Sequence, residues 1–122
     1  MAGQLINVTV YTDPADIRCA ATLDALGVAG IKHEVIDISV DEKALEVVRG
    51  LGYFETPVVV TSVGVHWDGL RQDKIDILVL LEVEAQRIAP YFVLAGVDFH
   101  DHLKRLNSSF DVIRKARGGM AT

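Results

Sequence analysis

The apolar residues of the chain follow two kinds of spacing that alternate along the sequence. In residues 5–11 (LINVTVY), β-branched and apolar side chains alternate with polar ones, and this period of two predicts a β-strand. In residues 17–30, apolar positions fall three or four apart, which predicts an amphipathic helix that ends at Gly27 or Gly30. The predicted apolar stripe of this helix comprises Ile17, Ala20, Ala21, Leu23, Leu26 and Val28.

The two periods continue to alternate further along the chain. Residues 32–38 (KHEVIDI) predict a second strand. Residues 39–53 predict a second helix, whose acidic first turn suits the helix dipole. Residues 56–67 predict two short strands in a hairpin with its turn at 62–64, and residues 70–86 predict a third amphipathic helix.

This order of elements defines the expected fold class. A β-α-β crossover, a helix and then a β-β-α unit predict an α/β fold with a four-stranded mixed sheet and helices on both faces. The arrangement is thioredoxin-type, and by length it is complete near Gln86. We therefore expect a sheet domain over residues 1–86 and a helical C-terminal extension over residues 87–122, with a disordered end (RGGMAT).

The extension carries an apolar seam of its own. Successive apolar residues of the seam lie 4, 3, 4 and 3 positions apart, which predicts one helix with one partner surface. Two shorter helices are also possible, because Asn107, Ser108 and Ser109 are weak helix formers. Charge changes too, from a net −7 over residues 1–97 to +2 over residues 98–122. The extension either packs back on the sheet domain or forms a docking or homodimerising arm through residues 88–115. The seam consists of Phe99, Leu103, Leu106, Phe110 and Ile113.

Composition narrows the classes of function. A chain of 122 residues, half of them hydrophobic, has the composition of one compact globular domain. The net charge of −5 argues against a nucleic-acid partner. No apolar run approaches the roughly 20 residues needed to span a membrane, so no membrane-spanning helix is expected. The chain has one cysteine and no evident signal peptide, which favours a reducing, cytoplasmic location.

That single cysteine lies in the segment YTDPADIRC, where the first strand is expected to meet the first helix. Thr12 and Asp13 are cap-type residues, Pro14 suits a first helical turn, and Asp16 adds negative charge there. A helix N-terminus presents unpaired N–H groups and about half a positive charge, so it stabilises an anion. Cys19 lies one turn further on, where we expect a partly buried and poorly reactive thiol. A reactive thiol able to form a mixed disulfide is the alternative.

Four segments together resemble a known family: VTVYTDPADIRCAATLDAL, HEVIDIS, LGYFETPVVV and HWDGLRQDKI. They are similar, in order and spacing over residues 7–80, to the glutaredoxin-like NrdH-redoxins, which feed electrons to ribonucleotide reductase. Members of that family use a Cys-x-x-Cys pair and accept electrons from thioredoxin reductase. In this chain Asp16 stands at the position of the nucleophilic cysteine, and Cys19 occupies that of the resolving cysteine.

The resemblance also implies a partner-binding surface. It implies a cis peptide bond before Pro57 that faces the helix start and leaves the Thr56 backbone free to pair with an extended partner segment. Without the resemblance, Pro57 would only begin an edge strand. Arg71 would bind an acidic or C-terminal group or remain a solvated charge, and Tyr53 or Phe54 would lie at the rim or in the core. The expected partner-binding residues are Tyr11, Pro14, Tyr53, Thr56, Pro57, Trp67 and Arg71.

No metal or other cofactor is expected. His100 and His102 would point about 200° apart on a helix, so they cannot share one ion there. Monothiol members of the wider superfamily that hold an iron–sulfur cluster use the first cysteine, which is Asp16 here.

Two functions follow as expectations. The first is a redoxin with a degenerate Asp-x-x-Cys site that cannot cycle a dithiol and acts mainly by binding a protein. By the resemblance, that protein would be thioredoxin reductase or ribonucleotide reductase. The second is a thiol–disulfide oxidoreductase that works through Cys19 alone. A structural or scaffolding subunit with other partners is a third reading.

Overall fold

The computed structural model describes residues 3–95 and residue 105, and it confirms the predicted order of elements. Its seven elements are β1 (Val8–Thr12), α1 (Ile17–Val28), β2 (Glu34–Asp37), α2 (Glu42–Gly50), β3 (Val58–Thr61), β4 (His66–Asp68) and α3 (Gln72–Ala95).

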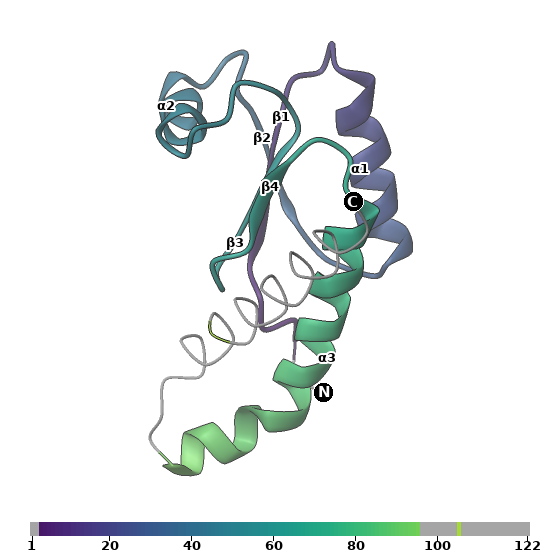
Figure 1. The fold of residues 1–122 in the computed structure, drawn as a ribbon, viewed down its shortest axis with the longest axis vertical. Coiled ribbons are helices and arrows are strands. Elements are labelled where there is room, and N and C mark those ends of the chain that lie inside the picture. Colours follow the sequence, from purple (N-terminus) through teal and green to yellow (C-terminus); the bar gives the residue numbers. More distant parts are fainter. Residues whose placement is uncertain (1–2, 96–104, 106–122) are drawn as a thin grey trace, which may run out of the picture.

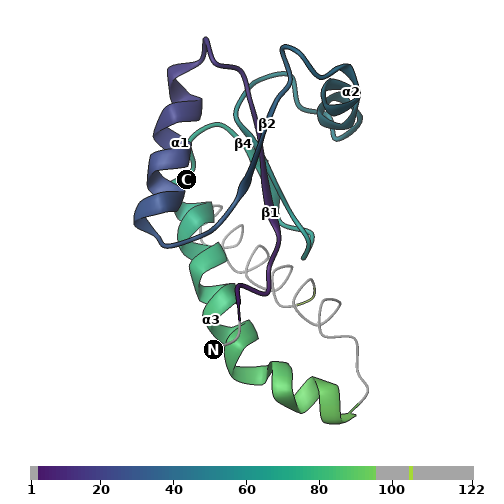
Figure 2. The same cartoon turned by 180° about the vertical axis from the view of Figure 1, so that it is seen from behind.

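The four strands form one mixed sheet in the order β2-β1-β3-β4. β1 pairs with β2 in parallel, while the β1–β3 and β3–β4 pairs are antiparallel. Helices α1 and α3 cover one face of the sheet and α2 covers the other (Figures 1 and 2). The predicted hairpin is confirmed, and Gly64 in its turn has a φ of 85°, which glycine adopts without steric cost. The chain therefore has the thioredoxin/glutaredoxin fold.

The first strand begins at Val8, three residues later than the sequence predicted. The backbone N–H groups of Leu5 and Ile6 donate instead to the Glu82 carboxylate of α3, at 2.8 and 2.9 Å. Leu5 and Ile6 therefore pair with a side chain of α3 rather than with a strand, while Asn7 pairs with Ser62 just after β3.

The main hydrophobic core lies between the sheet and the α1–α3 layer. Helix α1 contributes Cys19, Thr22 and Leu26 to the buried side. The predicted stripe was wrong at Ala20, which is exposed, and at its two ends, since Ile17 is 84% and Val28 is 91% exposed. At about 100° per residue, these two end positions lie roughly 200° from the buried Cys19 and Leu26. The residues of this core, from the sheet, the two helices and the segments that join them, are Ile6, Val8, Val10, Leu26, Ile31, Val59, Val63, Val65, Trp67, Ile75, Leu78, Leu81 and Ala85.

Helix α3 is longer than predicted and runs through Gln86 to Ala95. Pro90 lies inside it and removes one backbone hydrogen bond, and the helix changes direction in its last turns (Figure 1). The division of the chain at residue 86 stays a prediction. The seam from Phe99 to Ile113 and the predicted disordered end lie outside the described residues. Within the described part, no helix combines the length and apolar character needed to cross a membrane.

Candidate functional site

The start of α1 is built around Asp16, which is the N-cap of the helix. Its backbone is extended (φ −99°, ψ 112°), and its Oδ1 accepts a hydrogen bond from the Arg18 backbone N–H at 2.9 Å. The expectation that Thr12 or Asp13 caps the helix was therefore wrong. Asp13 instead closes the preceding turn, because its carbonyl accepts from the Asp16 N–H at 2.9 Å. Pro14 lies in this turn, exposed and outside the helix.

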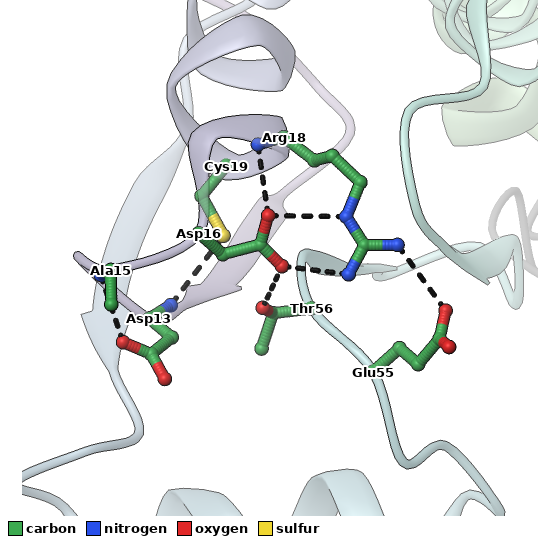
Figure 3. Close-up of polar contacts among 7 residues, drawn as sticks. All are labelled: Asp13, Ala15, Asp16, Arg18, Cys19, Glu55 and Thr56. Atoms are coloured by element: carbon green, nitrogen blue, oxygen red, sulfur yellow. Dashed lines mark hydrogen bonds and ion pairs between the residues drawn. The ribbon is translucent and has the colours of Figure 1, made fainter.

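The Asp16 carboxylate is held by two further groups besides the helix backbone (Figure 3). The Arg18 guanidinium donates through Nε to Oδ1 at 3.1 Å and through Nη2 to Oδ2 at 2.8 Å. The Thr56 hydroxyl, from the loop before β3, donates to Oδ2 at 2.7 Å. Arg18 also contacts Glu55 of that loop, with Nη1 3.3 Å from Oε2. One carboxylate thus joins the helix start to the loop that faces it.

These contacts determine the charge of the site. Hydrogen bonds from the Arg18 side chain, then from Thr56 and the Arg18 backbone, hold the pKa of Asp16 well below its usual range. The same ion pair raises the pKa of Arg18, with Glu55 adding to the effect. Asp16 therefore stays a carboxylate throughout the neutral range. A carboxylate can hold cations and N–H or O–H donors, but it cannot exchange with a disulfide.

Cys19 lies one turn after Asp16 and is only 4% exposed. Its sulfur accepts a weak contact from the Asp13 backbone N–H at 3.5 Å (Figure 3). The thiol is thus buried next to the Asp13–Asp16 turn, and its burial limits the access of a reagent. The burial expected of Cys19 from the sequence is confirmed.

The loop opposite the helix start contains the Thr56–Pro57 peptide bond, which is cis. Pro57 is buried, and its carbonyl accepts from the Gly69 N–H at 2.8 Å. Among the described residues, the backbone N–H and C=O of Thr56 form no hydrogen bond. The structure thus brings Thr56 and Pro57 together with Asp16, and leaves backbone groups available beside them.

The other predicted site residues lie apart from this carboxylate. Tyr11 is half-buried in the middle of β1, paired with β2 and β3. Tyr53 makes a 2.7 Å hydrogen bond with His66 Nδ1, and burial and the charge of Asp68 raise its pKa. Arg71 forms a two-bond ion pair with Asp73, at 3.0 and 2.8 Å.

Trp67 needs a correction, because the structure places its side chain in the core rather than on a partner-binding surface. It belongs to strand β4 between the exposed His66 and the half-exposed Asp68, so alternation turns it inward. Its indole Nε1 has no hydrogen-bond partner among the described residues. Trp67 is therefore a core residue of β4 and not part of an exposed binding surface.

Two residues of the site were missed by reasoning from the sequence. Arg18 carried a usable signal, because a cation two residues after a helix N-cap carboxylate can reach back to it. Glu55 carried none, since only the folded loop brings it to Arg18. No cluster of three potential metal ligands is present in residues 3–95 or at residue 105, and His100 and His102 lie outside them.

Comparison with known proteins gives a consistent set of relatives, although no protein-family model matches the chain. The chain is 32% identical over 71 residues to "Glutaredoxin-like protein NrdH" of Escherichia coli (strain K12), which covers 58% of this chain and 86% of that protein. The solved structure of the glutaredoxin-like NrdH-redoxin from Escherichia coli aligns with a TM-score of 0.55 at 33% identity. That alignment covers 59% of this chain and 93% of the solved chain. A glutaredoxin from Archaeoglobus fulgidus aligns with a TM-score of 0.50 at 28% identity, over 62% of this chain and 87% of the other.

Proposed function

The chain belongs to the glutaredoxin-like NrdH family of the thioredoxin superfamily, and from this premise we propose that it binds a protein partner without cycling a dithiol. The observation that carries the proposal is the bound Asp16 carboxylate at the N-cap of α1, beside the Thr56–Pro57 loop. By resemblance, this is the position from which a family member attacks with its first cysteine. In this chain, the position holds a permanent anion with no sulfur.

Electron transfer by a dithiol needs two sulfurs that exchange two electrons and two protons. The whole chain contains one cysteine, so no disulfide can form within it. Asp16 accepts hydrogen bonds in the place of a thiolate, but its oxygen atoms form no bond to sulfur in this chemistry. The charge of the site is thus retained while the family's reaction is absent within a single chain.

Binding is supported by the surface around the carboxylate. The unpaired backbone groups of Thr56 can add one strand-like segment of a partner, in the manner of β-addition. Ile17 directly follows Asp16 and Phe54 lies two residues before Thr56, and these side chains are 84% and 72% exposed. Aromatic side chains such as Phe54 are enriched at protein interfaces, and covering an exposed aliphatic side chain such as Ile17 removes apolar area from water. By resemblance, the partner would be thioredoxin reductase or ribonucleotide reductase.

The proposal is tested by measuring the affinity of the full chain for purified thioredoxin reductase and purified ribonucleotide reductase. We expect Ile17→Ser and Phe54→Ala each to weaken binding by roughly 10-fold or more. Val47→Ser is the matched control, because Val47 is a half-exposed aliphatic residue on α2, on the other face of the sheet. Equal losses in all three variants, or no binding to either enzyme, would overturn the proposal.

A second candidate function, disulfide exchange through Cys19 alone, is favoured by one observation. Cys19 lies one turn after Asp16, whose carboxylate accepts a hydrogen bond from Thr56, and its sulfur lies 3.5 Å from the Asp13 N–H. Insulin reduction with NADPH and thioredoxin reductase separates the two functions. Turnover that disappears in Cys19→Ser while partner binding is unchanged would establish the second function and would show that the chain is not a binding module alone.

A further inference from the structure

Loop 53–56, which lies between α2 and β3, is held in place by its side chains rather than by its backbone. Among the described residues, the backbone groups of Phe54, Glu55 and Thr56 form no hydrogen bond. Each of the four side chains of the loop instead contacts a neighbouring element. The contacts are Tyr53 with His66 of β4, Phe54 with Arg49 of α2, Glu55 with Arg18 of α1, and Thr56 with Asp16 at the start of α1.

The Asp16 carboxylate has no acceptor site left for a partner. An ionised carboxylate offers about four lone-pair sites to hydrogen-bond donors. Oδ1 accepts from the backbone N–H of Arg18 at 2.9 Å and from its Nε at 3.1 Å. Oδ2 accepts from Nη2 of Arg18 at 2.8 Å and from the Thr56 hydroxyl at 2.7 Å. Asp16 therefore acts within the chain, where it connects Arg18 to Thr56.

The guanidinium of Arg18 joins the helix start to loop 53–56 (Figure 3). Its planar group turns Nε and Nη2 toward Asp16, while Nη1 lies 3.3 Å from Oε2 of Glu55. One side chain thus holds two consecutive loop residues, Glu55 directly and Thr56 through Asp16. A lysine ammonium is a single point charge and does not reproduce this forked contact.

We propose that Arg18 is the positioning residue of the partner-binding surface. By holding Glu55 and Thr56 it keeps the unpaired Thr56 backbone groups in place for a partner segment, and Asp16 forms no bond to that partner. The role of the surface rests on the proposed function. The position of the loop does not, since it can be measured in the chain alone.

The exposure of the ion pair indicates how a substitution should act. The side chains of Arg18 and Glu55 are 46% and 65% exposed. Exposed ion pairs contribute little to the stability of a whole fold, whereas the order of a short segment depends on its few local contacts. Loss of the Arg18 guanidinium should therefore loosen loop 53–56 while the chain stays folded.

The first test measures the order of the loop by ¹⁵N relaxation of the full chain. We expect the backbone order parameters of residues 54–56 to fall from about 0.85 to below about 0.6 in Arg18→Met. Arg87→Met is the matched control, because Arg87 also donates two bonds to one carboxylate, that of Glu84, but lies on α3. It should leave residues 54–56 unchanged. Unchanged order in Arg18→Met overturns the proposal, as does equal loosening in the control.

Asp16→Asn gives an independent test of the same contact. Asparagine is as good an N-cap residue as aspartate, so the helix start is retained while the ion pair with Arg18 is lost. This variant should loosen residues 54–56 as Arg18→Met does, and Arg18→Lys should not restore their order. An ordered loop in folded Asp16→Asn contradicts the proposal.

The second test measures affinity for purified thioredoxin reductase and purified ribonucleotide reductase. Arg18→Met and Asp16→Asn should each weaken binding roughly 10-fold, and the double variant should lose no more than the weaker-binding single variant. Additive losses overturn the proposal, because Asp16 and Arg18 would then act on the partner separately. If the unsubstituted chain binds neither enzyme, the proposed function fails, and the order parameters alone decide whether Arg18 positions the loop.

Discussion

The substitution Asp16→Cys tests whether the helix start still has the geometry of a dithiol site. It replaces the N-cap carboxylate with a thiol and places that thiol one turn before Cys19. The Cys19 backbone N–H donates to the Asp16 carbonyl at 3.0 Å, so the two positions already belong to one closed turn. Helix positions three apart have Cβ atoms about 5–6 Å apart, and a disulfide needs about 3.5–4.5 Å. A small adjustment of the extended N-cap residue supplies this difference.

The size of the effect follows from the loop that the bond would close. For a four-residue loop, the chain-entropy relation gives about 2 kcal/mol of added stability in the oxidised form, before any strain. The introduced thiol would also take the place of an anion that Arg18 holds at 2.8 Å. Its pKa should fall below that of a free cysteine, which is about 8.5. The variant should therefore oxidise readily with oxidised glutathione and react rapidly when reduced.

The assay counts thiols and measures stability in both forms. After mild oxidation, the variant should show no free thiol, a mass lower by two hydrogens, and a higher free energy of unfolding than its reduced form. Ile17→Cys is the matched control, because it also adds one thiol at the helix start. Ile17 is exposed and lies about 200° around the helix from Cys19, so this control should keep two free thiols.

One result would refute the reasoning. If the folded Asp16→Cys variant retains two free thiols under conditions that oxidise a reference dithiol redoxin, the placement of position 16 beside Cys19 is wrong. If Ile17→Cys oxidises within the chain as well, the turn is loose, and the burial of Cys19 does not describe the protein in solution.

Three further predictions address the same structure. Labelling of Cys19 by a thiol reagent should be at least about 100-fold slower in the folded chain than in denaturant, because the residue is only 4% exposed; comparable rates would contradict its burial. The carboxyl of Asp16, followed by ¹³C NMR, should titrate below the ordinary value of 3.8, because the Arg18 side chain is the first cause of its lowered pKa. Its contribution to stability is therefore present above about pH 4 and is lost as the pH falls through the lowered pKa, and Arg18→Ala should move the midpoint upward. In guanidinium unfolding, Leu26→Ala should lower the free energy of unfolding by about 2–5 kcal/mol, whereas Val28→Ala should change it by less than about 0.5 kcal/mol; similar values would mean that the buried side of α1 is misassigned.

The element order could be predicted because each strand and helix has its own period of apolar residues. The face that a helix buries was less predictable. Ile17 and Val28 are apolar and fit a broad stripe, but the sheet lies against the side that contains Cys19 and Thr22. A polar threonine on the buried side carries no hydrophobic signal, so the stripe was assigned to apolar residues at the helix ends.

The contacts of the candidate site were also predictable only in part, because some join residues that are close in sequence and others join residues far apart. Asp16 and Cys19 are close in sequence, so their relation to the helix start could be inferred from spacing. The Thr56 hydroxyl reaches Asp16 across 40 residues, and Glu55 reaches Arg18 across 37. Such contacts depend on how the loop before β3 packs against the start of α1. A single sequence does not indicate how close these two segments lie in the folded chain. The family resemblance predicted Thr56 and Pro57 as site residues, whereas no feature of the sequence predicted Glu55.

The requirements of the α1 N-terminus show how an aspartate can occupy the position of a reactive cysteine without disturbing the helix. The N-terminus of α1 stabilises a negative charge, and this physical requirement is indifferent to whether sulfur or oxygen carries it. Aspartate is among the best N-cap residues, so Asp16 satisfies the helix without a thiolate. The same carboxylate also bonds Thr56, which keeps the partner-binding loop beside the helix. Under the proposed function, an aspartate at the family's nucleophile position removes the sulfur while preserving the charge and the position of the loop that we propose for recognition. For this reason, we expect partner binding to be separable from electron transfer in this protein.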